Sequence, residues 1–135
     1  MYQEYAIGMQ YVREVVLTGD ITPVPGTPDF IAGICAVRGE IISLVDLRPL
    51  FSLTEKGLTD LNRVIVLTDN KLTFGILADH ITGVGTIDMD QHPPIPAALP
   101  IDRKYILGVT GDSMIILDAA VLLSDPRMMI DEKEG

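Results

Sequence analysis

Two apolar runs that flank the triplet Arg38-Gly39-Glu40 constrain the fold of this chain more than any other feature. Residues 31–37 and 41–46 are rich in Ile, Val and Leu, and the polar triplet between them contains a glycine. Short β-branched runs joined by a Gly-containing turn are typical of a β-hairpin. Burying an unpaired charge is costly, so Arg38 is expected at the surface or in a salt bridge. This arrangement favours recognition over catalysis.

Short apolar runs separated by turn residues recur along the rest of the chain. Further strands are expected within residues 4–17 and at 63–68, 72–78, 81–87, 105–110 and 114–118. Short helices are expected near residues 49–51 and 119–123. About eight short strands with few helices predict an all-β barrel or sandwich.

Three blocks of the first half recur, in the same order, in the second half. They are 5–15 with 74–84, 30–34 with 105–109, and 39–51 with 111–123. We interpret them as a two-fold pseudo-repeat. Two small β-barrels of this size would be marginal alone, so they are expected to pack side by side and form a groove.

Composition excludes several classes of partner. The chain of 135 residues has a net charge of −9, 5% aromatic residues and no Trp, which disfavours nucleic acid and anionic lipid. No apolar run approaches the length of a membrane span and no signal peptide is visible, so no direct membrane insertion and a cytoplasmic location are expected. Cys35 is the only cysteine and is expected to be a buried thiol.

No set of residues with the spacing of a catalytic or metal site is found. Asp46 and Asp118 occupy matched positions of the two halves, but neither lies in the Asp-Thr-Gly turn of an aspartic protease. His80 and His92 lack a second ligand at suitable spacing. The sequence therefore predicts no enzymatic activity, no metal and no cofactor.

The run from Pro28 to Arg48, P-x-F-I-x-G-I-x-x-V-R-G-x-I-I-x-L-V-D-L-R, resembles the signature of CheW-like chemotaxis coupling domains. The resemblance extends from about Glu4 to Ser124. It implies two SH3-like five-stranded β-barrel subdomains around a shared core, with short helices and no enzymatic activity. It also implies an adaptor that couples the cytoplasmic tips of chemoreceptors to the regulatory domain of the histidine kinase CheA. On this basis we expect one domain over residues 1–135, with a first barrel at 19–70 and a second formed by 1–18 and 71–125.

The resemblance also assigns candidate contact residues by position. The receptor-binding set is Arg38, Val12, Glu14, Gly33, Ile81 and Val84. The kinase-binding set is Met9, Val15 and Ile41 on the first half, with Pro93, Ala97 and Ala98 in the Pro-rich loop. Arg38 matches the basic residue of the family's Leu-Arg-Gly element, and Glu14 matches its acidic partner.

The chain departs from the family pattern at two places. Ala36 stands where the family usually has Asn, and the usual opening strand is absent. Either the chain is cut short or the second barrel has an unpaired edge, which would favour self-association.

Other interpretations stay open at this stage. Arg38 could form a structural salt bridge with Asp46, and Val12, Ile81 and Val84 could belong to the core. The chain could serve a pilus or another chemosensory output, or be a small β-barrel that binds a ligand.

Overall fold

A two-residue turn joins the strands of the hairpin that the sequence predicts. In the computed structural model, which describes residues 4–50, 62–69, 71–79, 81–86, 103–112 and 114–128, β3 (Ile31–Val37) pairs antiparallel with β4 (Glu40–Val45). The turn residues Arg38 and Gly39 have φ angles of 51° and 81°. Two consecutive positive φ angles are those of a type I′ turn, whose twist matches the twist of the strands.

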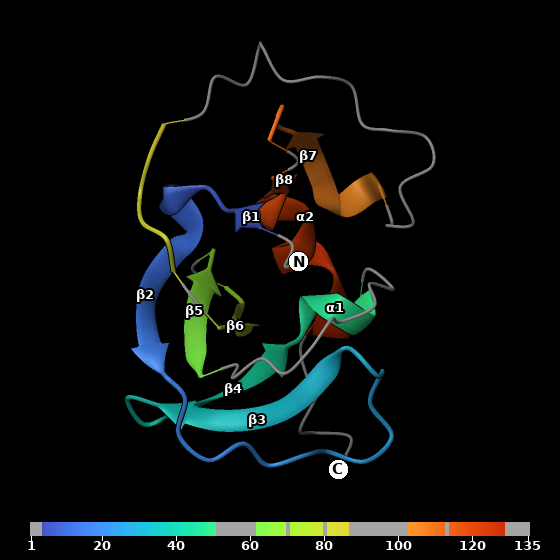
Figure 1. Cartoon of the computed structure of the whole chain (residues 1–135). Helices are drawn as coiled ribbons and strands as arrows, with labels where there is room; N and C mark the ends of the chain where they lie inside the picture. The colour runs from blue at the N-terminus through green and yellow to red at the C-terminus, as the bar shows by residue number, and fades with distance from the viewer. Residues whose placement is uncertain are drawn as a thin grey trace.

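The hairpin belongs to a five-stranded sheet with the order β2-β5-β6-β4-β3. The other strands are β2 (Val12–Leu17), β5 (Arg63–Thr68) and β6 (Thr73–Ala78). Although β2 and β3 are at opposite edges, Thr22, which follows β2, forms a bridge to Ile34 of β3. The sheet therefore curls until its two edges meet, as the curved ribbons of Figure 1 show.

A second, three-stranded sheet has the order β1-β8-β7. Its strands are β1 (Tyr5–Ala6), β7 (Ile106–Val109) and β8 (Ile115–Leu117). The helical elements are η1 (Met9–Tyr11), α1 (Leu47–Leu50), η2 (Arg103–Tyr105), α2 (Ala119–Ser124) and η3 (Pro126–Met128). In Figure 1, α2 lies between the second sheet and the larger one.

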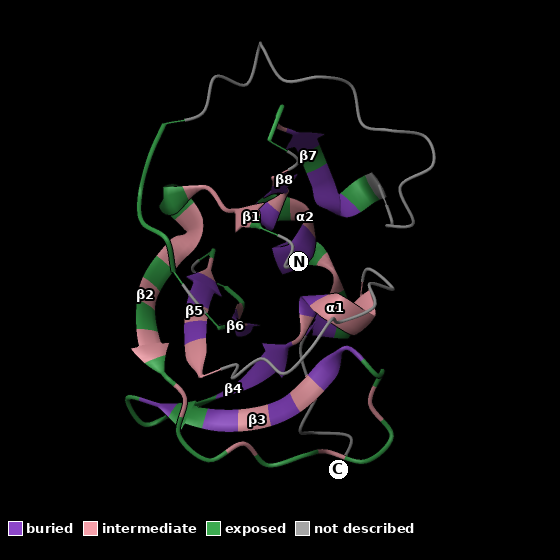
Figure 2. Ribbon diagram, viewed as in Figure 1, coloured by how far each residue is buried: buried purple, intermediate pink, exposed green. Residues whose placement is uncertain are grey.

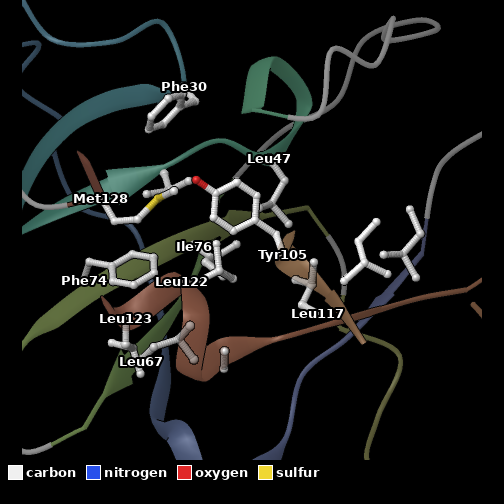
Figure 3. Close-up of a cluster of buried hydrophobic side chains, with 14 of the residues drawn as sticks. Phe30, Leu47, Leu67, Phe74, Ile76, Tyr105, Leu117, Leu122, Leu123 and Met128 are labelled. Atoms are coloured by element: carbon white, nitrogen blue, oxygen red, sulfur yellow. The ribbon is translucent and has the colours of Figure 1, made fainter. Parts of the chain in front are cut away.

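Two clusters of buried side chains form the hydrophobic core. The inner cluster lies within the five-stranded sheet and consists of Cys35, Val37, Ile42, Leu44, Val64, Val66 and Leu77. The shared cluster joins both sheets and α2 and includes Phe30, Val45, Leu67, Phe74, Tyr105 and Leu122 (Figure 3). Successive residues of a strand point to opposite faces, so β4 supplies Leu44 to one cluster and Val45 to the other. Figure 2 shows that buried residues dominate β4, β5 and β7, whereas exposed and intermediate residues alternate along β2.

The pseudo-repeat is visible in the register of the two hairpins. We call residues 30–50 the first unit and residues 105–124 the second unit. Each unit consists of two antiparallel strands followed by a short helix. Register shifts occur at the matched glycines, between Ile31 and Gly33 and between Ile106 and Gly108. The carbonyls of Phe30 and Tyr105 accept 2.8 Å hydrogen bonds from the matched backbone amides of Asp46 and Asp118.

The all-β class is confirmed, and the details differ from expectation. β2 and β6, which our boundaries placed in the second half, are hydrogen-bonded into the five-stranded sheet. Residues 81–86 do not form the expected strand, and Gly83 within them has a φ of 142°. A second five-stranded barrel, the missing opening strand and the extent of the domain stay predictions.

Candidate functional site

Arg38 is presented at the tip of the β3–β4 hairpin. It is the one non-glycine with a positive φ among the described residues, and its side chain is 75% exposed. The left-handed conformation is unfavourable for a residue with a Cβ atom, and such strain concentrates at functional sites. The turn residue that sequence reasoning singled out is therefore both exposed and conformationally unusual.

Glu14 of β2 anchors the Arg38 side chain. A bulge between Val12 and Glu14 interrupts the pairing of β2 with β5, and bulges re-aim the side chains next to them. The Nε of Arg38 donates a 2.6 Å hydrogen bond to Oε1 of Glu14. Arg13 joins the group by donating from Nε to Oε2 of Glu14 at 3.2 Å and from Nη1 to Oε1 of Glu40 at 2.9 Å. We call Arg13, Glu14, Arg38 and Glu40 the ion cluster.

Hydrogen bonds within the ion cluster favour the charged forms of Glu14 and Arg13. The hydrogen bond from Arg38 lowers the pKa of Glu14 below its ordinary value, with a smaller contribution from Arg13. The hydrogen bond to Glu40 raises the pKa of Arg13. These pairs also link the edge strand β2 to the tip of the β3–β4 hairpin at the other side of the sheet.

The alternative salt bridge between Arg38 and Asp46 is wrong. The carboxylate of Asp46 instead pairs with Arg48, whose Nη2 lies 2.6 Å from Oδ2. Arg38 is thus paired with Glu14 of β2 and not with the end of its own hairpin.

Exposed apolar side chains occur on β2 and β4, which carry the ion cluster, and on η1, which directly precedes β2. Met9, Val15 and Ile41, which we assigned to the kinase-binding set, are all exposed. Leu17 is 66% exposed on the outward-facing row of β2 that contains Val15, and sequence reasoning missed it. The alternation of Arg13, Val15 and Leu17 was the available signal, because residues two apart on a strand share a face.

The remaining residues of the receptor-binding set have varied environments. Ile81 and Val84 are exposed, Val84 by 79%, so they are not core residues. Val12 is partly buried against the shared cluster, as the core interpretation predicted. Gly33 is buried with a φ of 151°, and a Cβ atom there would lie 2.4 Å from the carbonyl oxygen of Thr22. That close approach explains the glycine without any partner.

The other kinase-binding candidates, Pro93, Ala97 and Ala98, lie outside the described residues. Within the described ranges, no three His, Cys, Asp or Glu side chains gather as a metal site requires. No helix among those residues is long and apolar enough to cross a membrane.

A second polar group, around the hydroxyl of Tyr105, was not predicted. Tyr105 donates to Asp125 and accepts from Arg127, and both partners lie at or next to η3. Burial, followed by the hydrogen bond to Asp125, raises the pKa of Tyr105 to about 12. Burial opposes ionisation of Asp125, yet the hydrogen bonds from Tyr105 and Arg127 lower its pKa to about 2. The sequence carried one signal for this group, since Asp125-x-Arg127 repeats the spacing of Asp46-x-Arg48.

An all-β domain with a strained charged turn and exposed apolar side chains beside it has the surface of a protein-binding adaptor. The chain belongs to the CheW-like domain family, whose family model matches residues 2–127. The resemblance found in the sequence is therefore confirmed.

Two curated relatives and one solved structure illustrate the similarity. The chain is 33% identical over 132 residues to the chemotaxis protein CheW of Klebsiella aerogenes, covering 95% of this chain and 80% of that protein. It is 32% identical over 133 residues to the chemotaxis protein CheW of Treponema pallidum, covering 92% and 78%. The structure is similar to the crystal structure of the scaffolding protein TtCheW from Thermoanaerobacter tengcongensis, with a TM-score of 0.72, 32% identity and coverage of 84% and 76%.

Proposed function

We propose that this chain is a non-enzymatic scaffold of a chemosensory pathway, which couples chemoreceptors to the histidine kinase CheA at membrane-bound receptor arrays in the cytoplasm. Membership of the CheW-like family supports the scaffold role, as do relatives named as chemotaxis proteins and one described as a scaffolding protein. The observation that carries the proposal is the presentation of Arg38, in a left-handed turn, by Glu14.

The ion cluster prepares Arg38 for binding. A guanidinium carries five N–H donors, and the contact with Glu14 uses the Nε donor. The exposed remainder can bind a carboxylate or carbonyl of a receptor tip in a fixed orientation. Because Glu14 already restricts the side chain, less conformational entropy is lost on binding.

The outward face of β2 and the start of β4 form the proposed kinase contact. Val15, Leu17 and Ile41 are exposed there, and the Arg13–Glu40 pair brings the two strands together. Apolar anchors surrounded by charged residues are typical of small interfaces. Each such contact would be weak, and the array would gain strength from several contacts at once.

The variant Arg38→Asn tests the receptor contact. Asn tolerates the left-handed conformation, and Asn-Gly is a favoured type I′ sequence, so the turn is kept while the guanidinium is lost. We expect binding to a purified receptor cytoplasmic hairpin to weaken roughly tenfold or more, as at an interface hot spot, by isothermal titration calorimetry. Lys71→Asn is the control, because it removes one exposed positive charge from the turn between β5 and β6. Equal affinity of Arg38→Asn and the control would refute the receptor contact.

The variant Leu17→Ser tests the kinase contact. We expect it to weaken binding to the CheA regulatory domain roughly tenfold while receptor binding stays unchanged. Leu107→Ser is the matched control, since Leu107 is an exposed leucine on β7 of the other sheet. Wild-type kinase affinity in the Leu17 variant would remove this face from the proposal.

The two alternative functions, ligand binding and a pilus or other chemosensory output, lead to separate outcomes. A ligand site inside the five-stranded sheet is disfavoured because the buried side chains of the inner cluster occupy it. A pilus or other chemosensory output would use the same surfaces with different receptors. Binding to the receptors of such a pathway, and not to those that control flagella, would identify it.

A further inference from the structure

Phe30 and Tyr105 are equivalent residues of the two units, and one short segment contacts both. Each aromatic residue directly precedes the first strand of its unit, and its carbonyl accepts the 2.8 Å hydrogen bond from the matched Asp. Both rings are buried in the shared cluster. Figure 3 shows the Tyr105 hydroxyl oxygen pointing to the side of the cluster where Phe30 and Met128 lie.

The contacting segment is residues 125–128, which we call the clamp. The Cζ of Arg127 lies 5.4 Å from the centre of the Phe30 ring, which is cation–π distance. The Nη2 of the same guanidinium donates to the Tyr105 hydroxyl and, at 3.2 Å, to Oδ2 of Asp125. One side chain therefore contacts the aromatic residue of each unit.

The next residue adds a second contact to the first unit. Met128 is fully buried, and its carbonyl accepts a 2.6 Å hydrogen bond from Oγ of Ser43 on β4. Ser43 is the one buried polar side chain of the described core. The clamp thus contacts the first unit through Phe30 and Ser43, and the second unit through Tyr105.

The local part of the clamp has a counterpart in the first unit, Asp46-x-Arg48. In both Asp46-x-Arg48 and Asp125-x-Arg127, the Arg backbone N–H donates a 3.0 Å hydrogen bond to Oδ1 of the Asp, and the Arg side chain pairs with the same carboxylate. A surface pair of this kind contributes little to stability. What distinguishes Arg127 is its position between the two aromatic rings.

We propose that Arg127 is a positioning residue that fixes the orientation of the two units relative to each other. Its guanidinium joins Phe30 to Tyr105, and the Asp125 carboxylate and the buried Met128 hold it in place. Insofar as the scaffold function proposed above holds, Arg127 also sets how the receptor contact at Arg38 is oriented relative to the second unit, without contacting a partner itself.

Residual dipolar couplings measured by NMR test the orientation without any partner. In the wild-type protein, couplings from the two units should fit one alignment tensor. In Arg127→Gln, which removes the charge at similar length, we expect the units to need different tensors or a changed relative orientation. Arg48→Gln is the matched control and should fit as wild type does. One tensor with the wild-type orientation in Arg127→Gln would overturn the proposal.

One further variant keeps the test decisive. Tyr105→Phe keeps the ring but removes the hydroxyl that Arg127 contacts, so it should change the relative orientation in the same direction and by less. It also serves if Arg127→Gln does not fold. Unchanged orientation in Tyr105→Phe when Arg127→Gln cannot be measured would likewise reject the clamp.

A binding measurement separates this proposal from the proposed function. We expect Arg127→Gln to weaken binding of the receptor hairpin roughly three- to tenfold, the range of couplings that act at a distance. A changed orientation with unchanged receptor affinity would keep the clamp and remove its link to binding. Absence of receptor binding in the wild-type protein would reject the proposed function and leave the orientation result valid.

Discussion

The two units share the features that build the fold and differ in the turns that connect their strands. Both shift register at a matched glycine, Gly33 or Gly108, and both end in an Asp followed by a short helix. The matched Asp118 caps α2 by accepting from the amide of Val121. These repeated features depend on backbone geometry, which any copy of the unit must keep.

The turns show where the copies have diverged. The first turn is the two-residue Arg38-Gly39 type I′ turn, held by Glu14. The second is longer and is closed by Thr110, whose amide donates to the Met114 carbonyl at 2.9 Å and whose hydroxyl accepts from the Met114 amide at 3.1 Å. The first turn presents a charged side chain, while Thr110 uses its polar atoms to close its own loop. Under the proposed function, the receptor contact therefore belongs to the turn of the first unit.

The largest expected effect comes from breaking a shared feature, by Gly33→Ala. The new Cβ would approach the Thr22 carbonyl within 2.4 Å at a φ that disfavours any L side chain. We expect a loss of about 3 kcal/mol in the free energy of unfolding, measured with urea. Gly19→Ala is the control, because nothing lies within 4 Å of its added Cβ. Equal stability of the two variants would mean that the Thr22 segment moves away freely.

The second-largest effect on stability concerns Tyr105. Its hydroxyl forms hydrogen bonds that Phe30, the equivalent residue of the first unit, cannot form. Asp125, which faces Tyr105 and Arg127, has a pKa of about 2 against an ordinary 3.8. A lowered pKa stabilises the fold above pH 4, and this contribution is lost as the pH falls toward 2. Its size is at most about 2 kcal/mol. Asp125→Asn should therefore be less stable at pH 6, with a smaller further loss between pH 4 and 2 than the wild type shows in urea unfolding. Parallel curves for the two proteins would contradict the assignment.

A smaller effect on the free energy of unfolding is expected for Ser43→Ala. The residue at the matched position of β8 is Ile115. Ile115 needs no hydrogen bond, whereas the hydroxyl of Ser43 satisfies the buried Met128 carbonyl. Losing that bond should cost about 1 kcal/mol. Ser124→Ala removes an exposed 2.8 Å hydrogen bond to the Val121 carbonyl and should cost clearly less in the same urea experiment. The reverse order would show that water replaces the Ser43 hydroxyl.

The smallest effect on stability is expected where the turns differ. Arg38→Asn removes the contact with Glu14, but it replaces a strained residue by one suited to the turn. The urea midpoint should therefore stay unchanged or rise slightly, even though receptor binding is expected to weaken. A marked fall in stability would show that the ion cluster mainly holds β2 against the β3–β4 hairpin and is not mainly a recognition feature.

The sequence predicted the hairpins because their signals are local. The apolar runs on either side of Arg38-Gly39, and those around Gly111-Asp112, indicate turns without any knowledge of distant residues. Sheet membership depends on pairing between residues far apart in the chain. For that reason the placement of β2 beside β5 and of β6 beside β4 could not be read from local pattern.

The candidate site was likewise predictable only in part. Arg38 and Glu14 were identified by position in a family pattern, and the structure brings them together. Arg13 and Arg127 were missed because their partners are set by a bulge and by the packing of η3, neither of which has a simple sequence signal.

The position of β4 has a consequence for how the molecule comes apart. Leu44 and Val45 are adjacent in the chain, both are fully shielded from solvent, and they belong to different clusters. The backbone of β4 therefore separates the two clusters. Water cannot enter one cluster without disrupting the strand that also bounds the other. Amide protons of β4 should accordingly be among the last to exchange with deuterium, through an opening that dissolves both clusters together.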